Sequence, residues 1–507
     1  MEEPEIQPLS QENVTPKESG GIPRLFRHSA IYTISTSVQR LQGLILTPIY
    51  TNLTYLPEMS QYSNYGLVYT FIAFMNFVYM YGMDSAFLRY YYLGKSDRKT
   101  VFSSTFFILL ISGCITSLFI SFFAGSIAHR VLFNKDLSDL IRLAAAILFL
   151  DSIGNLPFLL LRVEEKPVKF TLFRMLRFGI EILLNILFVV KMKMGVPGIL
   201  YANIIAATIN LFFMLPFARK FLAITIDRHL LVEMVKFGLP FLPNGIAYMT
   251  IEMIDRFLVT RYLGKDILAF YHANYKFASV LLLVIVGFRN AWQPFFLRAS
   301  QQPDARILYS RVMRYYLLAA GAIIVFITLF IKDLLTYKYF HSFYLLGKDY
   351  WPGIDFIPWI ILSYLFFGVY IIFTPAFYIQ RKSQYMMLFT GAGALLNILC
   401  NIWLIPRVGI WGAVVATVLA YFIMALSIGI VAQKIYPVPL DLKRGAILFF
   451  LIAVVYFVYF AIDLSFILRG MLFLLFSLVS WQVLLLPAEK TVMTKKLLKL
   501  KKTNRTP

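Results

Sequence analysis

Residues 236–264 read KFGLPFLPNGIAYMTIEMIDRFLVTRYLG, an apolar stretch that carries several charged residues. It is long enough to cross a bilayer, because a spanning helix needs about 20 mostly apolar residues. Its second half nevertheless carries Glu252, Asp255 and Arg256. An ionisable side chain at membrane depth is costly unless it faces protein or a water-filled cavity. The stretch therefore predicts a membrane helix that faces a polar interior.

Spacing suggests how some of these charges are neutralised. Glu252 and Arg256 are four residues apart, on one helix face, and this suits a structural ion pair. Asp255 lies on the same side, and such a pair does not account for it. Pro240 and Pro243, near the start of the stretch, free backbone carbonyls that neighbouring groups must satisfy.

The composition of the whole chain agrees with a membrane protein. Its 507 residues are 59% hydrophobic, with a mean hydropathy of +0.72. That is too apolar for a soluble chain of this length. The net charge of +22 resides mostly in short loops between apolar runs, which indicates membrane topology and not a nucleic-acid partner. Cys114 and Cys400 each lie inside an apolar run, so no disulfide framework is implied.

Fourteen apolar runs follow one another, each about the ~20 residues that a membrane span needs. With the N-terminus inside, the predicted cytoplasmic segments hold 30 Lys and Arg residues and the predicted outer loops hold 12. This asymmetry follows the positive-inside rule. We therefore predict an all-α polytopic membrane protein with 14 transmembrane helices and both termini cytoplasmic. The runs lie at 28–50, 64–88, 101–124, 140–161, 170–190, 196–217, 237–260, 268–296, 312–331, 353–379, 384–405, 409–432, 446–462 and 466–486.

An internal repeat divides these helices into two sets. Helices 1–6 resemble helices 7–12, and helices 13 and 14 are appended. An even number of helices per copy keeps both copies in one orientation, which gives a parallel repeat around a central cavity. The matching segments are GIEILLNIL at 179–187 with GAGALLNIL at 391–399, MGVPG at 194–198 with VGIWG at 408–412, and GMDSAF at 82–87 with GFRNAW at 287–292.

The domain boundaries follow from this repeat. Residues 1–27 are polar, acidic and proline-containing, and are predicted to be a disordered cytoplasmic tail, not a signal peptide. An N-lobe is expected over 28–220, a C-lobe over 221–434, and the last two helices over 435–486. Residues 487–507 form a basic, weakly amphipathic tail that is expected to lie on anionic lipid.

Basic residues occur inside or at the ends of the first two helices of each lobe. They are Arg40, Arg89, Arg256, Lys276 and Arg289. Arg40 lies on a polar stripe of its helix. Guanidinium groups match phosphate oxygens bidentately, so this set is predicted to bind an anionic, phosphate-bearing substrate. Arg89 and Lys276 could instead extend their charges to the membrane interface.

Three carboxylates, Asp84, Glu252 and Asp255, lie near those cations and are candidates for coupling transport to H⁺ or Na⁺. The alternative is that they are structural partners of the arginines. Scattered histidines and the lack of metal-ligand spacing or a nucleotide-binding loop predict no metal, no organic cofactor and no enzymatic activity.

The fifth apolar run carries charges of its own. Arg177 and Glu181 are four residues apart, and a structural ion pair is the leading interpretation. Asp151, in the preceding run, suits either a proton or cation site or a pair with a neighbouring helix.

Fourteen spans, duplicated six-helix lobes, the GxxG starts at 195–198 and 409–412, and the pattern GLPFLPN…IDRFLVTRYLG together resemble the polysaccharide flippase family. That family belongs to the multidrug/oligosaccharidyl-lipid/polysaccharide exporter superfamily. The resemblance implies a substrate made of an oligosaccharide joined through pyrophosphate to a polyprenyl lipid. It also implies transport by alternating access across the bacterial inner membrane for O-antigen, capsule or exopolysaccharide assembly. Membrane lipid, a polysaccharide polymerase and other assembly proteins are the implied partners.

Three other functions compete with this one. A lipid II flippase for peptidoglycan also uses arginines in its cavity. An ion-coupled multidrug antiporter would favour a cavity of acids and aromatics. A membrane glycosyltransferase or polymerase typically needs a large outer loop with catalytic residues, and the longest outer loop predicted here spans only 332–352. The identity of the glycan and of the coupling ion stays open.

The predicted topology can be tested with reporter fusions. Fusions at Ser60 and Lys348 should report an extracytoplasmic location, whereas fusions at Lys95 and Arg381 should report a cytoplasmic one. A cytoplasmic signal at Lys348 would overturn the fourteen-span topology.

Overall fold

The computed structural model is built from helices, as the sequence predicts. It describes residues 42–93, 96–164, 166–223, 226–300, 302–339, 344–380, 382, 385–487 and 489–490. Residues 42–50 are helical. The longer helices that follow are α2 (Met59–Met80), α3 (Met83–Leu93), α4 (Arg98–Phe122), α5 (Ala124–Arg130), α6 (Ser138–Val163), α7 (Pro167–Asn185), α8 (Gly195–Ala218), α9 (Arg228–Gly238), α10 (Phe241–Leu263), α11 (Lys265–Ala278), α12 (Val280–Ala299), α13 (Ala305–Thr336), α14 (Ile357–Phe373), α15 (Pro375–Ile379), α16 (Tyr385–Val408), α17 (Ile410–Ile435), α18 (Leu442–Ala461) and α19 (Phe466–Leu484).

Shorter helical turns connect some of these elements. A π-helical turn over Ile186–Lys191 continues α7, and a 3-10 segment over Lys348–Phe356 precedes α14. Two further 3-10 turns occupy Lys135–Leu137 and Arg219–Phe221.

The helices confirm a multi-pass membrane protein. In the described part of the chain, eleven helical segments are long and apolar enough to cross a membrane, and the pair α11 and α12, bent by 45°, makes a twelfth if counted as one span. The first predicted run is described only from residue 42, and α7 carries Arg174, Arg177 and Glu181 within its length. Fourteen spans are compatible with this arrangement, and that number stays a prediction.

Large apolar side chains cover the outside of the helices. Phe122 is 82% exposed and Phe457 is 72% exposed. Soluble proteins rarely expose wide apolar surfaces, so this outside is a surface for lipid.

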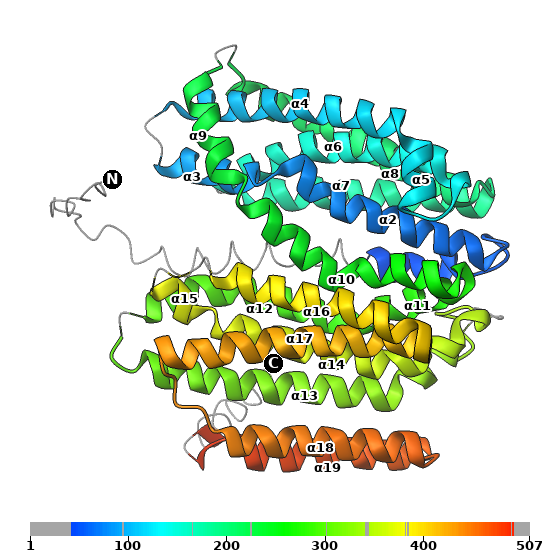
Figure 1. Ribbon diagram of the computed structural model, residues 1–507, viewed down its shortest axis with the longest axis vertical. Coiled ribbons are helices and arrows are strands. Elements are labelled where there is room, and N and C mark those ends of the chain that lie inside the picture. Colours follow the sequence, from blue (N-terminus) through cyan, green and yellow to red (C-terminus); the bar gives the residue numbers. More distant parts are fainter. Residues whose placement is uncertain are drawn as a thin grey trace, which may run out of the picture.

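The helices gather into two groups (Figure 1). Helices α2 to α8 fill the upper half of the view and α12 to α17 the lower half, while α10 runs between them. We call these groups the N-lobe and the C-lobe, and assign α10 and α11 to the C-lobe. The lobes meet where α2 packs against α10 and α11, and α18 and α19 pack on α13 at the lower edge.

The stretch 236–264 joins the two lobes. It breaks between α9 and α10, near Pro240, so that α9 packs on α3 and α4 of the N-lobe while α10 packs on α16 and α17 of the C-lobe. A second break separates α2 from α3 at Tyr81 and Gly82, which have φ of 29° and +79°. The two breaks touch, because Gly82 lies against the backbone of Gly238.

Matched glycines support the internal repeat. Gly195 and Gly409 open α8 and α17, and both have positive φ, at 62° and 64°. One turn later, a Cβ on Gly198 would lie 2.9 Å from Met194 Cβ, and a Cβ on Gly412 would lie 2.6 Å from the backbone nitrogen of Ile405. Both copies therefore use one glycine for the turn and a second for close approach to the preceding segment.

An ion-pair cluster anchors the segment after α19. Glu489 lies 2.5 Å from Arg314 and 3.3 Å from Arg311, both on α13. Burial raises the pKa of the Glu489 carboxyl, but the hydrogen bond from Arg314 and the two positive charges outweigh burial and hold the pKa below its usual range. The cluster fixes this end of the chain to the C-lobe.

The contact between the two breaks predicts the effect of a substitution. Gly82→Ala places a Cβ onto the carbonyl oxygen of Gly238 in a left-handed backbone conformation, and should destabilise the protein by roughly 2 kcal/mol or more. The measurement is thermal unfolding of the detergent-solubilised protein. Gly125→Ala, where a Cβ meets no atom within 4 Å, is the matched control and should leave Tm nearly unchanged. Equal Tm values for the two variants would contradict a tight contact at Gly82.

Candidate functional site

A cavity of about 870 Å³, with charged and amide side chains in its wall, lies between helices of the N-lobe and α10. Its size is at the upper end of the ~300–1,000 Å³ that ligand pockets occupy. The wall combines residues 42–50, α2, α3, α6, α7, α8 and the first half of α10. Its charged lining residues are Asp84, Asp151, Arg174, Arg177 and Glu181, and its amide-bearing lining residues are Gln42, Asn76, Asn155, Asn203 and Asn244.

Arg177 on α7 is the centre of a polar network across four helices. Its Nη2 lies 2.7 Å from Asp151 Oδ1 on α6 and 3.0 Å from Asn203 Oδ1 on α8. Asn203 Nδ2 in turn donates to Tyr69 Oη on α2, at 3.1 Å. The sequence left two interpretations of Asp151 open, and the structure gives Asp151 a partner on the neighbouring helix, Arg177.

Arg174 and Glu181 flank Arg177 on the same helix. The Arg174 guanidinium lies 4.0 Å from the centre of the Phe158 ring, which is a cation–π contact. The buried Glu181 carboxyl is within hydrogen-bond reach of the Gln42 side chain. Spacings of three and four residues put Arg174, Arg177 and Glu181 on one face of α7, and that face lines the cavity.

The charge of this wall differs from the sequence expectation. Among the described lining residues, three carboxylates stand against two arginines. The fifth apolar run supplies both arginines, although sequence reasoning favoured a structural role for its charges. A stripe of ionisable residues spaced by three and four along an apolar run was the signal that could have marked this face as polar.

The residues predicted to bind substrate are dispersed. Arg40 lies outside the described residues. Arg89, on α3, is exposed and holds its guanidinium 4.6 Å from the centre of the Phe237 ring. Arg289, on α12, is exposed, and neither it nor Arg89 is among the described lining residues. Of all eight predicted site residues, Asp84 is the one that lines the cavity in the described part of the chain.

Arg256 belongs to a closed network in the C-lobe. It forms an ion pair with Asp255 at 2.9 Å, and its Nε donates to His272 Nδ1 at 3.3 Å. Its guanidinium also lies 4.4 Å from the centre of the Tyr275 ring. Asp255 accepts a second hydrogen bond from Tyr271, at 2.5 Å. Asp255 and Arg256 are 0% and 3% exposed, so this network is packed inside the protein.

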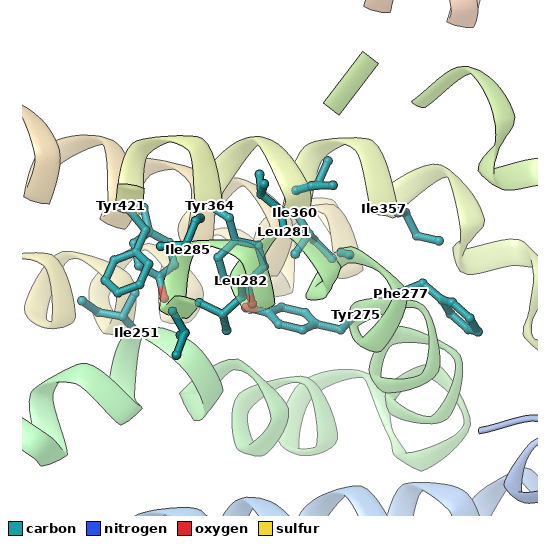
Figure 2. Close-up of a cluster of buried hydrophobic side chains, with 14 of the residues drawn as sticks. Ile251, Tyr275, Phe277, Leu281, Leu282, Ile285, Ile357, Ile360, Tyr364 and Tyr421 are labelled. Carbon is teal, nitrogen blue, oxygen red and sulfur yellow. The ribbon is translucent and has the colours of Figure 1, made fainter. Parts of the chain in front are cut away.

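Glu252 is held one turn earlier on α10. Its carboxyl accepts hydrogen bonds from Tyr421 and from Tyr364, the latter at 3.3 Å. Figure 2 shows Tyr421 near Ile251 and Tyr364 near Leu282, in a cluster of buried hydrophobic side chains. Glu252 is therefore integrated into the packing between α10, α14 and α17.

Lys276 lies at the seam between the lobes. Its Nζ is 3.2 Å from Tyr65 Oη, and Tyr65 lines the cavity. No group of three or more His, Cys, Asp or Glu side chains that could hold a metal occurs among the residues that the structure places. The arrangement can bind a polar or charged group at membrane depth by hydrogen bonds and charge.

A double-mutant cycle tests the central ion pair. The Arg177 and Asp151 side chains are 15% and 24% exposed, so Asp151→Asn and Arg177→Gln should show a coupling energy of about 1–3 kcal/mol in unfolding free energy. The matched control is the pair Asp139 and Arg142, whose side chains are 82% and 56% exposed. That pair should couple by at most about 1 kcal/mol. Equal coupling in both cycles would show that the Arg177 pair is as solvated as a surface pair.

We compared the chain with known proteins to find its relatives. No curated protein matches the chain. Two of the solved structures that share its fold illustrate the likeness. The lipid II flippase MurJ, in an inward closed conformation, is 16% identical with a TM-score of 0.68, covering 92% of this chain and 99% of that one. A multidrug resistance MATE family transporter of the MOP superfamily, inward-facing, is 15% identical with a TM-score of 0.66, covering 80% and 97%.

A sequence family gives the closer assignment. The family described as "Polysaccharide biosynthesis protein" matches residues 56–339, more than half of the chain, including every described charged residue of the cavity wall. The family expected from the sequence is therefore confirmed: the chain belongs to the polysaccharide biosynthesis protein family and shares the fold of these two solved structures.

Proposed function

We propose that this protein moves an oligosaccharide linked through pyrophosphate to a polyprenyl lipid across the bacterial inner membrane, by alternating access between its two lobes. The observation that carries the proposal is the polar cavity, because a membrane protein of a polysaccharide biosynthesis family needs a wet site for a sugar headgroup at membrane depth. The prenyl chain can remain in lipid while the headgroup crosses.

The cavity wall offers the chemistry that such a headgroup requires. Arg174 and Arg177 supply guanidinium groups for phosphate oxygens. Asn76, Asn155 and Asn203 supply amides that can donate to and accept from sugar hydroxyls. A charge-assisted hydrogen bond in such a site contributes roughly 1.5–3 kcal/mol, which is about tenfold to a hundredfold in affinity.

Carboxylates in the same wall support coupling to an ion gradient. Asp84, Asp151 and Glu181 face the space in which substrate would lie. Phosphate bound by Arg177 would compete with Asp151 for the guanidinium, which would free that carboxylate to take up H⁺ or Na⁺. Glu252 and Asp255 stay predicted coupling residues. The carboxyl of Glu252 accepts hydrogen bonds from two tyrosines, and that of Asp255 contacts Tyr271 and Arg256.

A reconstituted flipping assay tests the function. Proteoliposomes carry a polyprenyl-pyrophosphate oligosaccharide, and a membrane-impermeant glycosidase reports how fast the glycan changes leaflet. Arg174→Met and Arg177→Met should slow the exchange at least about tenfold, because each removes a charge-assisted contact. Arg40→Ala tests the sequence prediction for helix 1 in the same assay. Arg142→Met, an exposed arginine of α6, is the control.

Full exchange with Arg174→Met and Arg177→Met would reject the phosphate-binding role of these arginines. The absence of any protein-dependent exchange with this lipid would reject the proposed substrate. Lipid II, tested in parallel, separates the peptidoglycan alternative from the polysaccharide one.

One observation favours a second candidate, an ion-coupled multidrug antiporter. The described cavity wall has more carboxylates than arginines, and it carries Tyr50, Tyr65, Tyr69, Phe77, Phe158 and Phe241. Acids and aromatic rings suit organic cations. Ethidium efflux that is lost in Asp151→Asn and in Glu181→Gln, without glycan exchange, would favour the antiporter.

A further inference from the structure

Three tyrosines surround the ammonium group of Lys276. The Lys276 Nζ lies 4.5 Å from the ring centre of Tyr65, 5.3 Å from that of Tyr62 and 5.9 Å from that of Tyr50. All three distances fall within the ~6 Å over which a cation is attracted to an aromatic face. The ammonium also donates to Tyr65 Oη, at 3.2 Å. We call Tyr50, Tyr62 and Tyr65 the tyrosine cage.

The cage and the lysine come from different lobes. Tyr62 and Tyr65 are on α2, and Tyr50 is in the helical segment that precedes it, whereas Lys276 is on α11. Lys276 sits two residues before the end of α11, where the chain bends by 45° into α12. The contact therefore joins the N-lobe to the first half of a broken C-lobe helix.

Other contacts close the same seam. His272 lies one turn before Lys276, and the centre of its ring is 5.6 Å from the centre of the Tyr62 ring. The imidazole also packs against Gly66, where a Cβ would lie 3.1 Å from it. Toward the predicted outer end, the backbone nitrogen of Gly347 donates to Thr51 Oγ1 at 3.1 Å. These contacts between the lobes, at Lys276, His272 and Gly347, lie on the side of the cavity toward the loop that begins at residue 51.

Lys276 is held by ring faces and a phenol oxygen. No carboxylate lies within 4.0 Å of its Nζ among the residues whose placement is described. A cation held by aromatic faces is attracted less strongly than one in a buried ion pair, whose separation leaves an uncompensated charge. Moving Lys276 out of these contacts therefore separates no ion pair among the described residues.

The cage is also part of the cavity wall. Tyr50 and Tyr65 line the cavity, and Tyr50 Oη donates to Asn185 Oδ1 at 2.6 Å, on the helix that carries Arg177. The ring of Tyr65 lies 4.6 Å from that of Tyr69, which accepts a hydrogen bond from the Asn203 amide beside Arg177. A ligand against this wall would contact the rings that hold Lys276.

We propose that Lys276 and the tyrosine cage form the latch that closes the predicted outer end of the cavity, and that the lysine must leave the cage for that end to open. The proposal rests on the alternating access of the proposed function. It assigns Lys276 a role between the lobes, as a positioning residue, in place of direct contact with substrate in this closed arrangement.

The test measures access to the cavity and needs no substrate. Gly154 lines the cavity, and a Cβ there meets no atom within 4 Å, so Gly154→Cys provides a reporter thiol. Cys114→Ser and Cys400→Ser remove the native thiols. A membrane-impermeant maleimide added from the predicted outer side of oriented proteoliposomes labels the reporter when that end opens.

Lys276→Met should raise the labelling rate on the order of tenfold, because loss of a desolvated cation–π cluster shifts the closed state toward the open one. Tyr65→Leu, which removes one cage wall from the other lobe, should raise it in the same direction. Lys276→Arg keeps the charge over the rings and should restore slow labelling. Lys265→Met, at the start of the same helix, is the matched control and should leave the rate unchanged.

An unchanged labelling rate in both Lys276→Met and Tyr65→Leu overturns the latch. A rise that Lys276→Arg fails to reverse also overturns it, because packing and not charge would then explain the effect. Because labelling is read without glycan, a failed flipping assay and a failed latch are separate results.

Discussion

A charged side chain cannot be left facing lipid, and this constraint organises the interior of the protein. The chain meets it in two ways. In the C-lobe, Asp255 and Arg256 neutralise each other and are covered by tyrosine rings and His272. In the N-lobe, Asp151 and Arg177 also pair, but their network borders an open volume of about 870 Å³. One lobe encloses its charges in packing, and the other arranges them around a space.

This difference arises between lobes that carry matched sequence segments. Asn185 and Asn397 occupy matched positions in the LLNIL segments, and both are 0% exposed. Four residues earlier, however, the N-lobe has Glu181 where the C-lobe has Gly393. A Cβ at position 393 would lie 3.1 Å from the Ile251 side chain, so glycine allows Ile251 to pack closely here. Glu181, at the matching position of the N-lobe, lines the cavity. At this matched position, the acid of the N-lobe belongs to a polar wall and the glycine of the C-lobe belongs to a packed interface.

Sequence periodicity predicted the fold better than the site. Apolar runs and the repeat identified helices, their order and the family, because those features depend on local composition and spacing. They also identified Glu252, Asp255 and Arg256 as charges within a span, and the structure packs these three inside the C-lobe and not along the described cavity wall. Whether a buried charge faces solvent or a partner depends on residues distant in sequence, such as Tyr421 for Glu252 and Asp151 for Arg177. Such pairings are set by how helices cross, and a single sequence does not reveal them.

The break between α9 and α10 has a mechanical consequence. Because α9 packs on the N-lobe and α10 on the C-lobe, any rotation of one lobe against the other twists the backbone torsions of the few residues between them. Leu239 still donates to the carbonyl oxygen of Val235, but Pro240 has no N–H to lose. The pivot thus lies at a residue that can bend without losing a hydrogen bond from its own backbone nitrogen.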